Sequence, residues 1–193
     1  MPHRLLEHRG GNGANGSRDV AGDIMAGCLA GLVATGPMTL ALELVRRGLP
    51  GPDAPFPPKE VTMGMARKVG LKRHMDEETE WAATWAAHFG YGSGVGAVYG
   101  AIAPRVPWPA VPKGMAYGVA VWALSYLGWL PAVGIVQPLV RRPVRQQTAL
   151  IVAHLVWGAA TGALTEVFRG RAGPPRTRPR AKPEAARHPV SRG

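Results

Sequence analysis

The sequence predicts an all-α protein, an integral membrane four-helix bundle, and three observations support this prediction. The 193-residue chain contains four long runs of mostly apolar residues, each close to the roughly 20 residues that a helix needs to cross a bilayer. None of these runs shows the polar face that is typical of a helix on the surface of a soluble protein. The second and fourth runs also share a sequence pattern, which predicts two related helical hairpins.

We expect a membrane domain over residues 21–169, with four spans at about 24–45, 81–103, 114–136 and 148–168. Tryptophans support these bounds. Trp81 and Trp85 open the second span, and Trp108 follows it. These are positions at which aromatic side chains gather at the two membrane–water interfaces.

Two prolines fall inside the predicted spans, Pro37 in the first and Pro131 in the third. Proline lacks the amide hydrogen that a helix interior needs, and membrane helices tolerate it when neighbouring groups satisfy the freed carbonyl. Thr35 and Thr39 flank Pro37 and could do this locally. We therefore expect kinks at both prolines.

The repeat is clearest in two segments, Ala87–Val98 (AHFGYGSGVGAV) and Ala153–Leu164 (AHLVWGAATGAL). Both read Ala-His, then an aromatic-Gly pair, then Gly-Ala and an aliphatic residue. In the first and third spans the best anchors of the repeat are Gly31 and Gly118. Because an even number of spans separates the copies, we expect parallel repeats.

Glycines recur every four residues in three of the spans. In lipid, small residues at this spacing allow two helix backbones to approach closely. We therefore predict helix packing along these stripes, and Gly96→Leu should destabilise the fold. The stripes could instead bind other membrane helices. The glycines concerned are Gly27, Gly31, Gly92, Gly96, Gly100, Gly158 and Gly162.

His88 and His154 are the ionisable groups inside the spans that most deserve a functional hypothesis. They lie seven and six residues into spans that cross in the same direction, so both rings should sit roughly 10 Å from one interface. A neutral interhelical hydrogen bond, a proton-responsive role and bis-histidine haem ligation all remain open. Zinc is less favoured, because four ligands are not visible. We predict no metal and no cofactor.

The sequence does not indicate an enzyme. It shows no nucleophile with a base, no phosphate-binding loop and no carboxylate pair. The single cysteine, Cys28, excludes an intrachain disulfide and fits a small packing residue. Glu43 at the edge of the first span is expected to pair with Arg46, one turn on.

The ends of the chain differ from its centre in composition. Residues 1–20 and 170–193 should be disordered, and the second of these tails is basic and rich in Pro and Arg. The formal net charge of +11 could indicate nucleic-acid binding. Because these charges lie in tails and loops, anionic lipid headgroups are the better partner. The basic C-terminal cluster favours both termini in the cytoplasm.

One loop is long enough to hold a further element. Residues 58–70 should form a short amphipathic helix on the membrane surface, with Val61, Met65 and Val69 on its apolar face. The acids of residues 76–80 follow, and they suit the N-terminus of the second span, where the helix dipole favours negative charge.

The segments Ala87–Gly92 and Ala153–Gly158 resemble a bacterial inner-membrane family typified by YagU, a domain of unknown function. Ala120–Pro131 (AVWALSYLGWLP) is also similar to members of that family. The resemblance covers roughly Ile24–Phe168 and leaves the basic tail outside it. It implies a multi-pass inner-membrane protein without an established enzymatic activity, with a contribution to acid resistance.

Two functions therefore remain open. The first is a stress-related membrane protein whose histidines sense or conduct protons. The second is a structural or assembly protein whose glycine faces bind a membrane-protein partner or a second copy of the chain.

Overall fold

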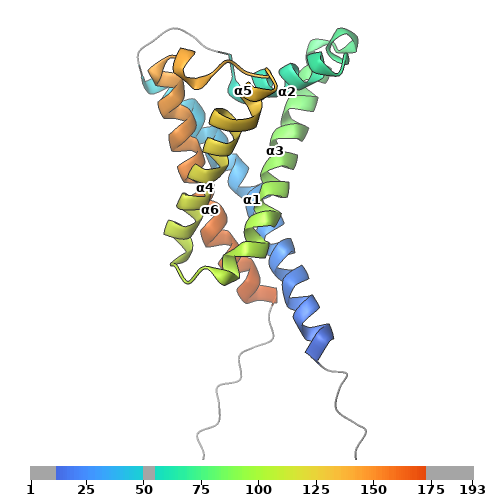
Figure 1. The fold of residues 1–193 in the computed structure, drawn as a ribbon, viewed down its shortest axis with the longest axis vertical. Coiled ribbons are helices and arrows are strands. Elements are labelled where there is room, and N and C mark those ends of the chain that lie inside the picture. Colours follow the sequence, from blue (N-terminus) through green and yellow to red (C-terminus); the bar gives the residue numbers. More distant parts are fainter. Residues whose placement is uncertain (1–11, 50–54, 173–193) are drawn as a thin grey trace, which may run out of the picture.

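Within residues 12–49 and 55–172, which the computed structural model describes, every regular element is helical, and this confirms the all-α class. Four long helices alternate in direction, so the start of the first and the end of the last lie at the same end of the molecule (Figure 1). They are α1 (Asn12–Gly48), α3 (Glu77–Ile102), α4 (Ala110–Ala123) and α6 (Val144–Ala172).

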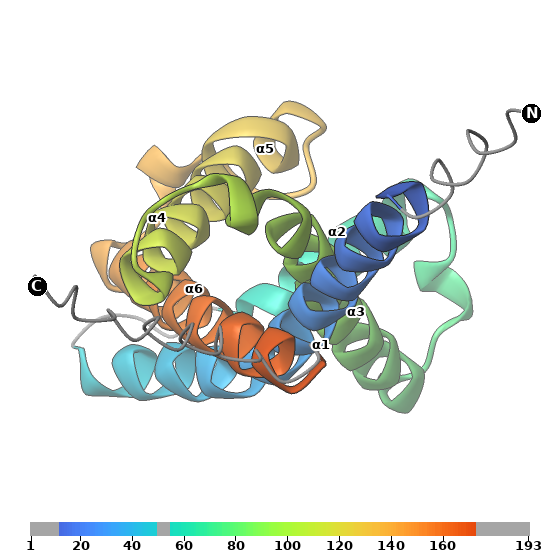
Figure 2. The same cartoon turned by 90° about the horizontal axis from the view of Figure 1, so that it is seen from below.

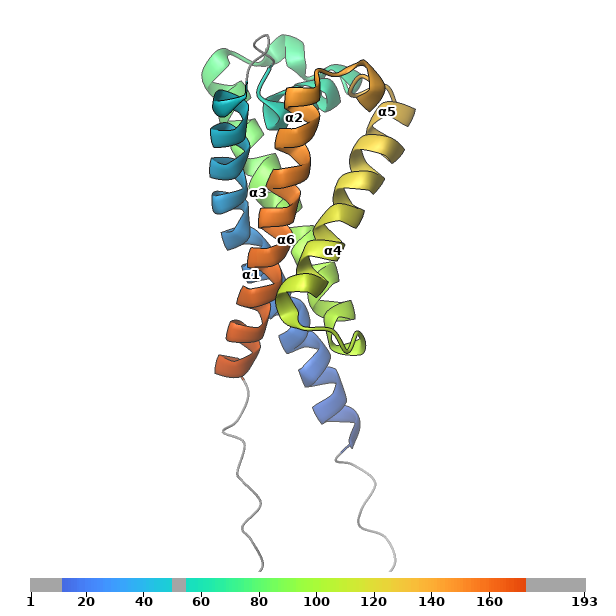
Figure 3. The ribbon, with the colours of Figure 1, turned by 90° about the vertical axis from the view of Figure 1, so that its left-hand side faces the viewer.

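Short helical elements occupy the connections. α2 and α5 lie together at the end of the molecule opposite to the start of α1 (Figures 1 and 3). The short elements are α2 (Pro57–Lys68), η1 (Lys72–His74), η2 (Ala103–Arg105), η3 (Leu124–Trp129), α5 (Leu130–Ala132) and η4 (Leu139–Arg141).

The long helices pack as two antiparallel pairs, α1 with α3 and α4 with α6. A third interface, between α1 and α6, joins the two pairs. α3 and α4 make little direct contact although they are consecutive in the chain. Seen along the long axis, α3 lies on one side of the molecule and α4 on the other, and α1 runs from the side of α3 across to the side of α6 (Figure 2).

Glycine allows both pairs to pack backbone against backbone. A Cβ atom on Gly31 would lie 2.2 Å from the carbonyl oxygen of Gly92, and one on Gly114 would lie 2.0 Å from that of Gly158. No side chain fits at such distances. All seven glycines singled out in the sequence lie in these two interfaces: Gly27, Gly31, Gly92, Gly96, Gly100, Gly158 and Gly162.

The glycine contacts of the two pairs do not match the anchors that the sequence suggested for the repeat, Gly31 and Gly118. Gly31 packs against the glycines four and eight residues after His88. The residue that packs against the corresponding glycines after His154 is Gly114, one turn before the anchor Gly118 that the sequence suggested. The spacing alone could not show whether Gly114 or Gly118 makes this contact, because glycines recur every four residues on both helices.

Two helices are long and apolar enough to cross a membrane, Val20–Gly48 within α1 and Val144–Gly170 within α6. The other two predicted spans do not qualify. The histidine, tryptophans, tyrosines and glycines of α3 lower its hydropathy, and α4 is 14 residues long. A core helix of a soluble protein can pass the same test, so this finding identifies two candidate spans and does not show a membrane location.

The predicted disordered N-terminal tail overlaps this fold. α1 begins at Asn12, so residues 12–20 of the predicted tail are helical. Residues 1–11 and 173–193, and with them most of the predicted basic tail, lie outside the described part of the chain.

The third predicted span is interrupted more strongly than a proline kink requires. α4 ends at Ala123 and continues as the π-helical η3, in which Gly128 has non-helical torsion angles of φ −101° and ψ −110°. α5 then spans only three residues around Pro131. The interruption spreads over several residues because the missing amide of Pro131 falls next to a glycine that holds no helical conformation.

α1 continues through Pro37 and changes direction along its length (Figure 3). The expected compensation by threonines is wrong. The hydroxyls of Thr35 and Thr39 donate to the carbonyls of Gly31 and Thr35, each at 2.8 Å. Neither donates to the Val33 carbonyl, which loses its amide partner at Pro37.

α2 packs on the end of the bundle with only part of the face that we predicted: Val61 contacts the core and Met65 lines a cavity, but the buried residues lie at other positions of the helix. Met63 and Ala66 are buried, and a Cβ on Gly64 would lie 2.7 Å from the carbonyl oxygen of Ile135. Met65 and Val69, which we placed on the apolar face, are 46% and 68% exposed. The spacing of apolar residues within α2 could not predict this, because the residues that become buried depend on contacts with segments that are distant in sequence.

Candidate functional site

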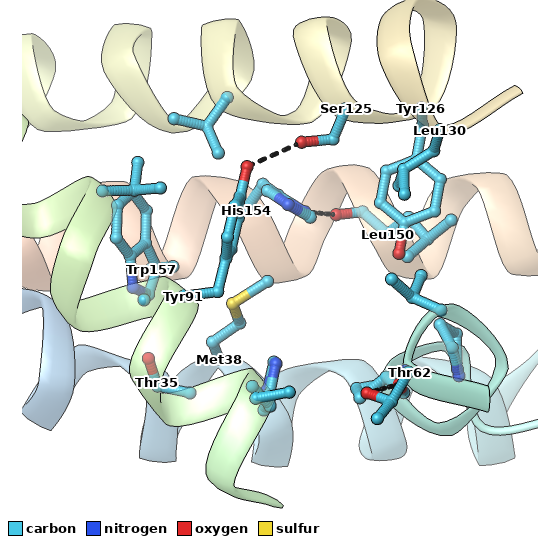
Figure 4. Close-up of a pocket in the computed structure, with 18 of the residues that line it drawn as sticks. Thr35, Met38, Thr62, Tyr91, Ser125, Tyr126, Leu130, Leu150, His154 and Trp157 are labelled. Carbon is cyan, nitrogen blue, oxygen red and sulfur yellow. Dashed lines mark hydrogen bonds between the residues drawn. The ribbon is translucent and has the colours of Figure 1, made fainter. Parts of the chain in front are cut away.

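A cavity of about 210 Å³ lies between the two helix pairs and under α2 (Figure 4). Aliphatic and aromatic side chains from every helix of the bundle form most of its wall. None of its lining residues in the described part of the chain is an acid, a lysine or an arginine. Its polar lining residues are Thr35, Thr62, His88, Tyr91, Ser125, Tyr126 and His154.

Both histidines that the sequence singled out line this cavity. They come from different pairs, His88 from α3 and His154 from α6, and these two helices run in the same direction. The sequence could place the two rings at a similar depth, but it could not say whether they share a site. The structure brings them to one site.

His154 is buried, with 6% of its surface exposed. Its Nδ1 lies 2.7 Å from the carbonyl oxygen of Leu150, one turn earlier in α6 (Figure 4). A carbonyl can only accept, so Nδ1 carries the hydrogen and Nε2 is left as an acceptor. The ring meets Tyr126 edge to face, with centroids 6.0 Å apart.

His88 is tied to the neighbouring helix. Its Nε2 lies 3.0 Å from the hydroxyl oxygen of Thr39 on α1. Because that hydroxyl already donates to the Thr35 carbonyl, it can only accept from the ring, and Nε2 carries the hydrogen. Among the described residues Nδ1 makes no hydrogen bond, so each histidine keeps one nitrogen available as an acceptor.

The π-helical segment η3 supplies further polar groups. Ser125 lies 3.1 Å from the Tyr91 hydroxyl and so links η3 to α3 (Figure 4). Tyr126 is 8% exposed, and its hydroxyl points into the cavity without a hydrogen bond to another described residue. Trp129 also lines the cavity. π-Helical turns often occur at functional sites, because they turn extra side chains towards one face.

An ion pair lies near the cavity, where the Arg142 guanidinium is 5.9 Å from the ring centroid of Tyr126. Both carboxylate oxygens of Glu60 on α2 accept from Arg142, at 2.9 and 2.7 Å. The Arg142 side chain is only 4% exposed, and it also donates to the Gln137 carbonyl. This bidentate pair fastens α2 to the connection between α5 and α6.

Aromatic side chains fill the bundle at the other end of the cavity. Tyr117 packs between Tyr99 and Trp157, with tilted rings whose centroids are 5.1 and 6.1 Å apart, and its hydroxyl donates to the Val95 carbonyl. Trp157 donates to the carbonyl of Gly31 at 3.2 Å. The cavity is therefore closed towards the α3–α4 loop.

The geometry bears on the metal and haem alternatives. No group of three or more His, Cys, Asp or Glu side chains within residues 12–49 and 55–172 is placed to hold a metal ion. An apolar cavity of about 150 Å³ accommodates benzene. A cavity of about 210 Å³ is thus too small for a macrocycle of four pyrrole rings, and bis-histidine haem ligation does not fit.

Sequence reasoning overlooked Ser125 and Tyr126 as site residues. The available signal was weak, a glycine and a proline at 128 and 131 inside an apolar run. Together they indicate a local break in a helix. They do not indicate a π-helix, nor do they tell which side chains turn inward.

Comparison with curated proteins gave no match, and comparison with solved structures gave none. The sequence does match the family described as "Protein of unknown function (DUF1440)" over residues 50–163. This is more than half of the chain, and it contains both histidines and the π-helical segment but not α1. The chain therefore belongs to the DUF1440 family.

Proposed function

We propose that this chain is a multi-pass protein of the bacterial inner membrane in which His88 and His154 form a proton-responsive site that contributes to acid or stress resistance. The observation that carries the proposal is that both histidines line one largely apolar cavity. We propose no enzymatic reaction.

Exposed apolar side chains support the membrane location. One flank of α1 presents large aliphatic residues over most of its length, and the described part of the chain leaves these side chains largely uncovered. A soluble monomer rarely exposes so long an apolar surface. The exposed residues are Met25, Leu29, Leu32, Val33, Leu40 and Leu44, between 38% and 61% exposed.

The resemblance to the YagU-like family supports the inner membrane and the link to acid resistance. The start of α1 and the end of α6 lie at one end of the molecule (Figure 1), as two cytoplasmic termini require. The proposed binding of anionic headgroups falls to the C-terminal tail, which lies outside the described residues.

The geometry favours sensing protons over conducting them. Each histidine can take a proton on its available nitrogen without losing the hydrogen bond that ties it to Thr39 or to Leu150. Two cationic rings in one largely apolar cavity would repel, so we expect the pair to hold a single proton. The packed rings of Tyr99, Tyr117 and Trp157 lie beyond the cavity and disfavour a continuous path for protons through this part of the bundle.

The second function, binding other helices through the glycine stripes, is less well supported. The stripes are occupied by the chain's own helices. A Cβ on Gly96, for example, would lie 2.4 Å from the carbonyl oxygen of Gly27. A partner or a second copy would have to bind elsewhere on the surface.

The test replaces both histidines while keeping their ties. His88→Gln retains an amide near the Nε2 position, and His154→Asn retains one near Nδ1. We expect the fluorescence of the cavity residues Trp129 and Trp157 to change between about pH 8 and about pH 4 in wild-type protein in nanodiscs. The double variant should lose this change, and cells expressing it should lose any acid survival that the wild type confers.

His74→Gln is the matched control, because His74 is exposed and lies outside the cavity. This variant should titrate and survive as the wild type does. A double variant with wild-type titration and wild-type survival would overturn the proposal.

A further inference from the structure

We infer that the cavity binds a neutral, membrane-soluble molecule whose aromatic ring carries a hydroxyl group. The inference rests on the proposed membrane location, and it gives the histidine site a ligand. Four features of the cavity carry it: its size, its lack of charge, the polar groups that converge in it and the position of its mouth.

The size of the cavity fits one substituted ring. A cavity of about 150 Å³ lined by aliphatic and aromatic residues binds benzene. A volume of about 210 Å³ leaves room for the ring and a polar substituent. Met38, Leu42 and Leu150 are among the apolar residues that would contact the ring.

The absence of charge in the lining selects a neutral ligand. An ion buried here would lose its hydration without gaining a counter-charge. The nearest ion pair, Glu60 with Arg142, is already satisfied by its bidentate contact. While both histidines are neutral, a carboxylic acid or an amine in its charged form is therefore disfavoured.

The polar groups match a hydroxyl. Both histidines line the cavity, and the nitrogens that keep an acceptor site are Nε2 of His154 and Nδ1 of His88. Tyr126 directs a hydroxyl without a hydrogen bond to another described residue into the same space (Figure 4). A phenolic hydroxyl can donate to a histidine nitrogen and accept from Tyr126 at the same time. A ring without a donor would leave the acceptor nitrogens without a partner.

We place the mouth of the cavity on the side of the bundle, because three of its lining residues are also exposed there. Tyr91, Trp129 and Met65 line the cavity and are also 46%, 40% and 46% exposed. They come from α3, η3 and α2, on the side where α3 and α4 hardly touch. In a membrane this side faces lipid, so the ligand enters from the bilayer. The ring can be a free phenol or the headgroup of a quinol whose tail stays in the lipid.

The experiment uses the full chain in nanodiscs and fluorine NMR. We expect a separate bound signal for 4-fluorophenol at a fixed neutral pH. Fluorobenzene has nearly the same shape and no hydroxyl, and it should bind roughly 3- to 10-fold more weakly, the effect of one lost hydrogen bond. Equal affinity for the two probes would overturn the inference.

Two variants remove the groups that should recognise the hydroxyl. His154→Asn keeps the tie to Leu150 and removes the acceptor, and Tyr126→Phe removes only an oxygen. Each should weaken 4-fluorophenol binding by roughly 3- to 10-fold and leave fluorobenzene unchanged. Tyr99→Phe is the matched control, because Tyr99 is a buried tyrosine that does not line the cavity. Wild-type affinity in both cavity variants would overturn the inference.

Competition separates the two sources of the ring. Displacement of 4-fluorophenol by decylhydroquinone would assign the site to a membrane quinol, and failure to displace it would assign the site to a free phenol. Binding is measured at one pH, so a chain that fails to bind 4-fluorophenol contradicts the ligand inference without testing the proposed pH response. A chain that binds 4-fluorophenol but shows no histidine-dependent pH response contradicts only the proton-responsive role.

Discussion

The α1–α3 pair and the α4–α6 pair use the same packing and differ in how regular their helices are. In both pairs, glycine backbones touch where no side chain fits. α3 is an unbroken helix of 26 residues, whereas α4 gives way to a π-helical turn after 14. The shared feature sets which helices pair. The difference shapes one wall of the cavity, because the irregular segment supplies Ser125 and Tyr126 to its lining.

The two histidines repeat this contrast. His88 bonds to Thr39 on the partner helix and so ties α3 to α1, whereas His154 bonds to Leu150 within its own helix. Equivalent positions in a repeated sequence thus make different contacts, one between two helices and one within a single helix. A change at His88 is expected to loosen the first pair, while a change at His154 acts mainly on the cavity.

The largest expected effect comes from breaking the packing that the two pairs share. In Gly96→Leu or Gly162→Leu, the new side chain would start 2.4 or 2.2 Å from a carbonyl oxygen of the facing helix. We expect each variant to lose about 3 kcal/mol or more of unfolding free energy, because the helices must separate. Thermal unfolding in detergent measures this loss.

Gly94→Leu is the control in the same helix, because a Cβ at Gly94 meets no atom within 4 Å. It should unfold close to the wild-type temperature. Unchanged stability in both interface variants would count against the glycine contacts, and a loss in only one would show that the two pairs differ in packing as well as in regularity.

Sequence patterns predicted the features that depend on local spacing. The glycine stripes follow from a period of four residues. The parallel placement of His88 and His154 follows from their similar depth in two helices that run in the same direction. The π-helix and the buried face of α2 depend on contacts between distant segments, such as Gly64 against Ile135. The sequence suggested Gly118 as the anchor of the second pair, whereas Gly114 packs against Gly158 and Gly162. Spacing could not distinguish the two, because a shift of one helical turn keeps every glycine on its stripe.

A second prediction tests whether the connections of the two pairs are coupled. Glu60→Gln would leave the guanidinium of Arg142, whose side chain is 4% exposed, without its anion. Breaking a buried ion pair costs roughly 3–5 kcal/mol, and because Glu60 is 21% exposed we expect about 2 kcal/mol here. Denaturant unfolding should show this loss, and proteolysis should cut faster around α2.

Glu166→Gln provides the comparison for that prediction. Glu166 also pairs with an arginine, Arg169, but its side chain is 44% exposed. Solvent screens such pairs, so the change should be within about 0.5 kcal/mol. Equal effects from the two variants would mean that Glu60 and Arg142 do not hold α2 in place.

The smallest effect concerns the N-termini of the inner helices, which differ between the pairs. α4 follows Pro109 and has no side-chain cap, whereas α3 begins at Asp76, whose carboxylate accepts from the Thr79 amide at 2.9 Å. Hydrogen bonds from the Thr79 side chain and amide hold the pKa of Asp76 below its ordinary value of 3.8. Folding lowers this pKa. The charged cap therefore stabilises the fold at any pH above the pKa of the unfolded state, and this contribution disappears as the pH falls through the pKa of the folded state.

Asp76→Ala should therefore lower the unfolding temperature at neutral pH and converge with the wild type in acid. Glu78→Ala, which changes an acid of the same turn that is not the cap, should cause a smaller loss. A gap between Asp76→Ala and the wild type that persisted at the lowest pH would mean that the residue acts through packing and not through its charge.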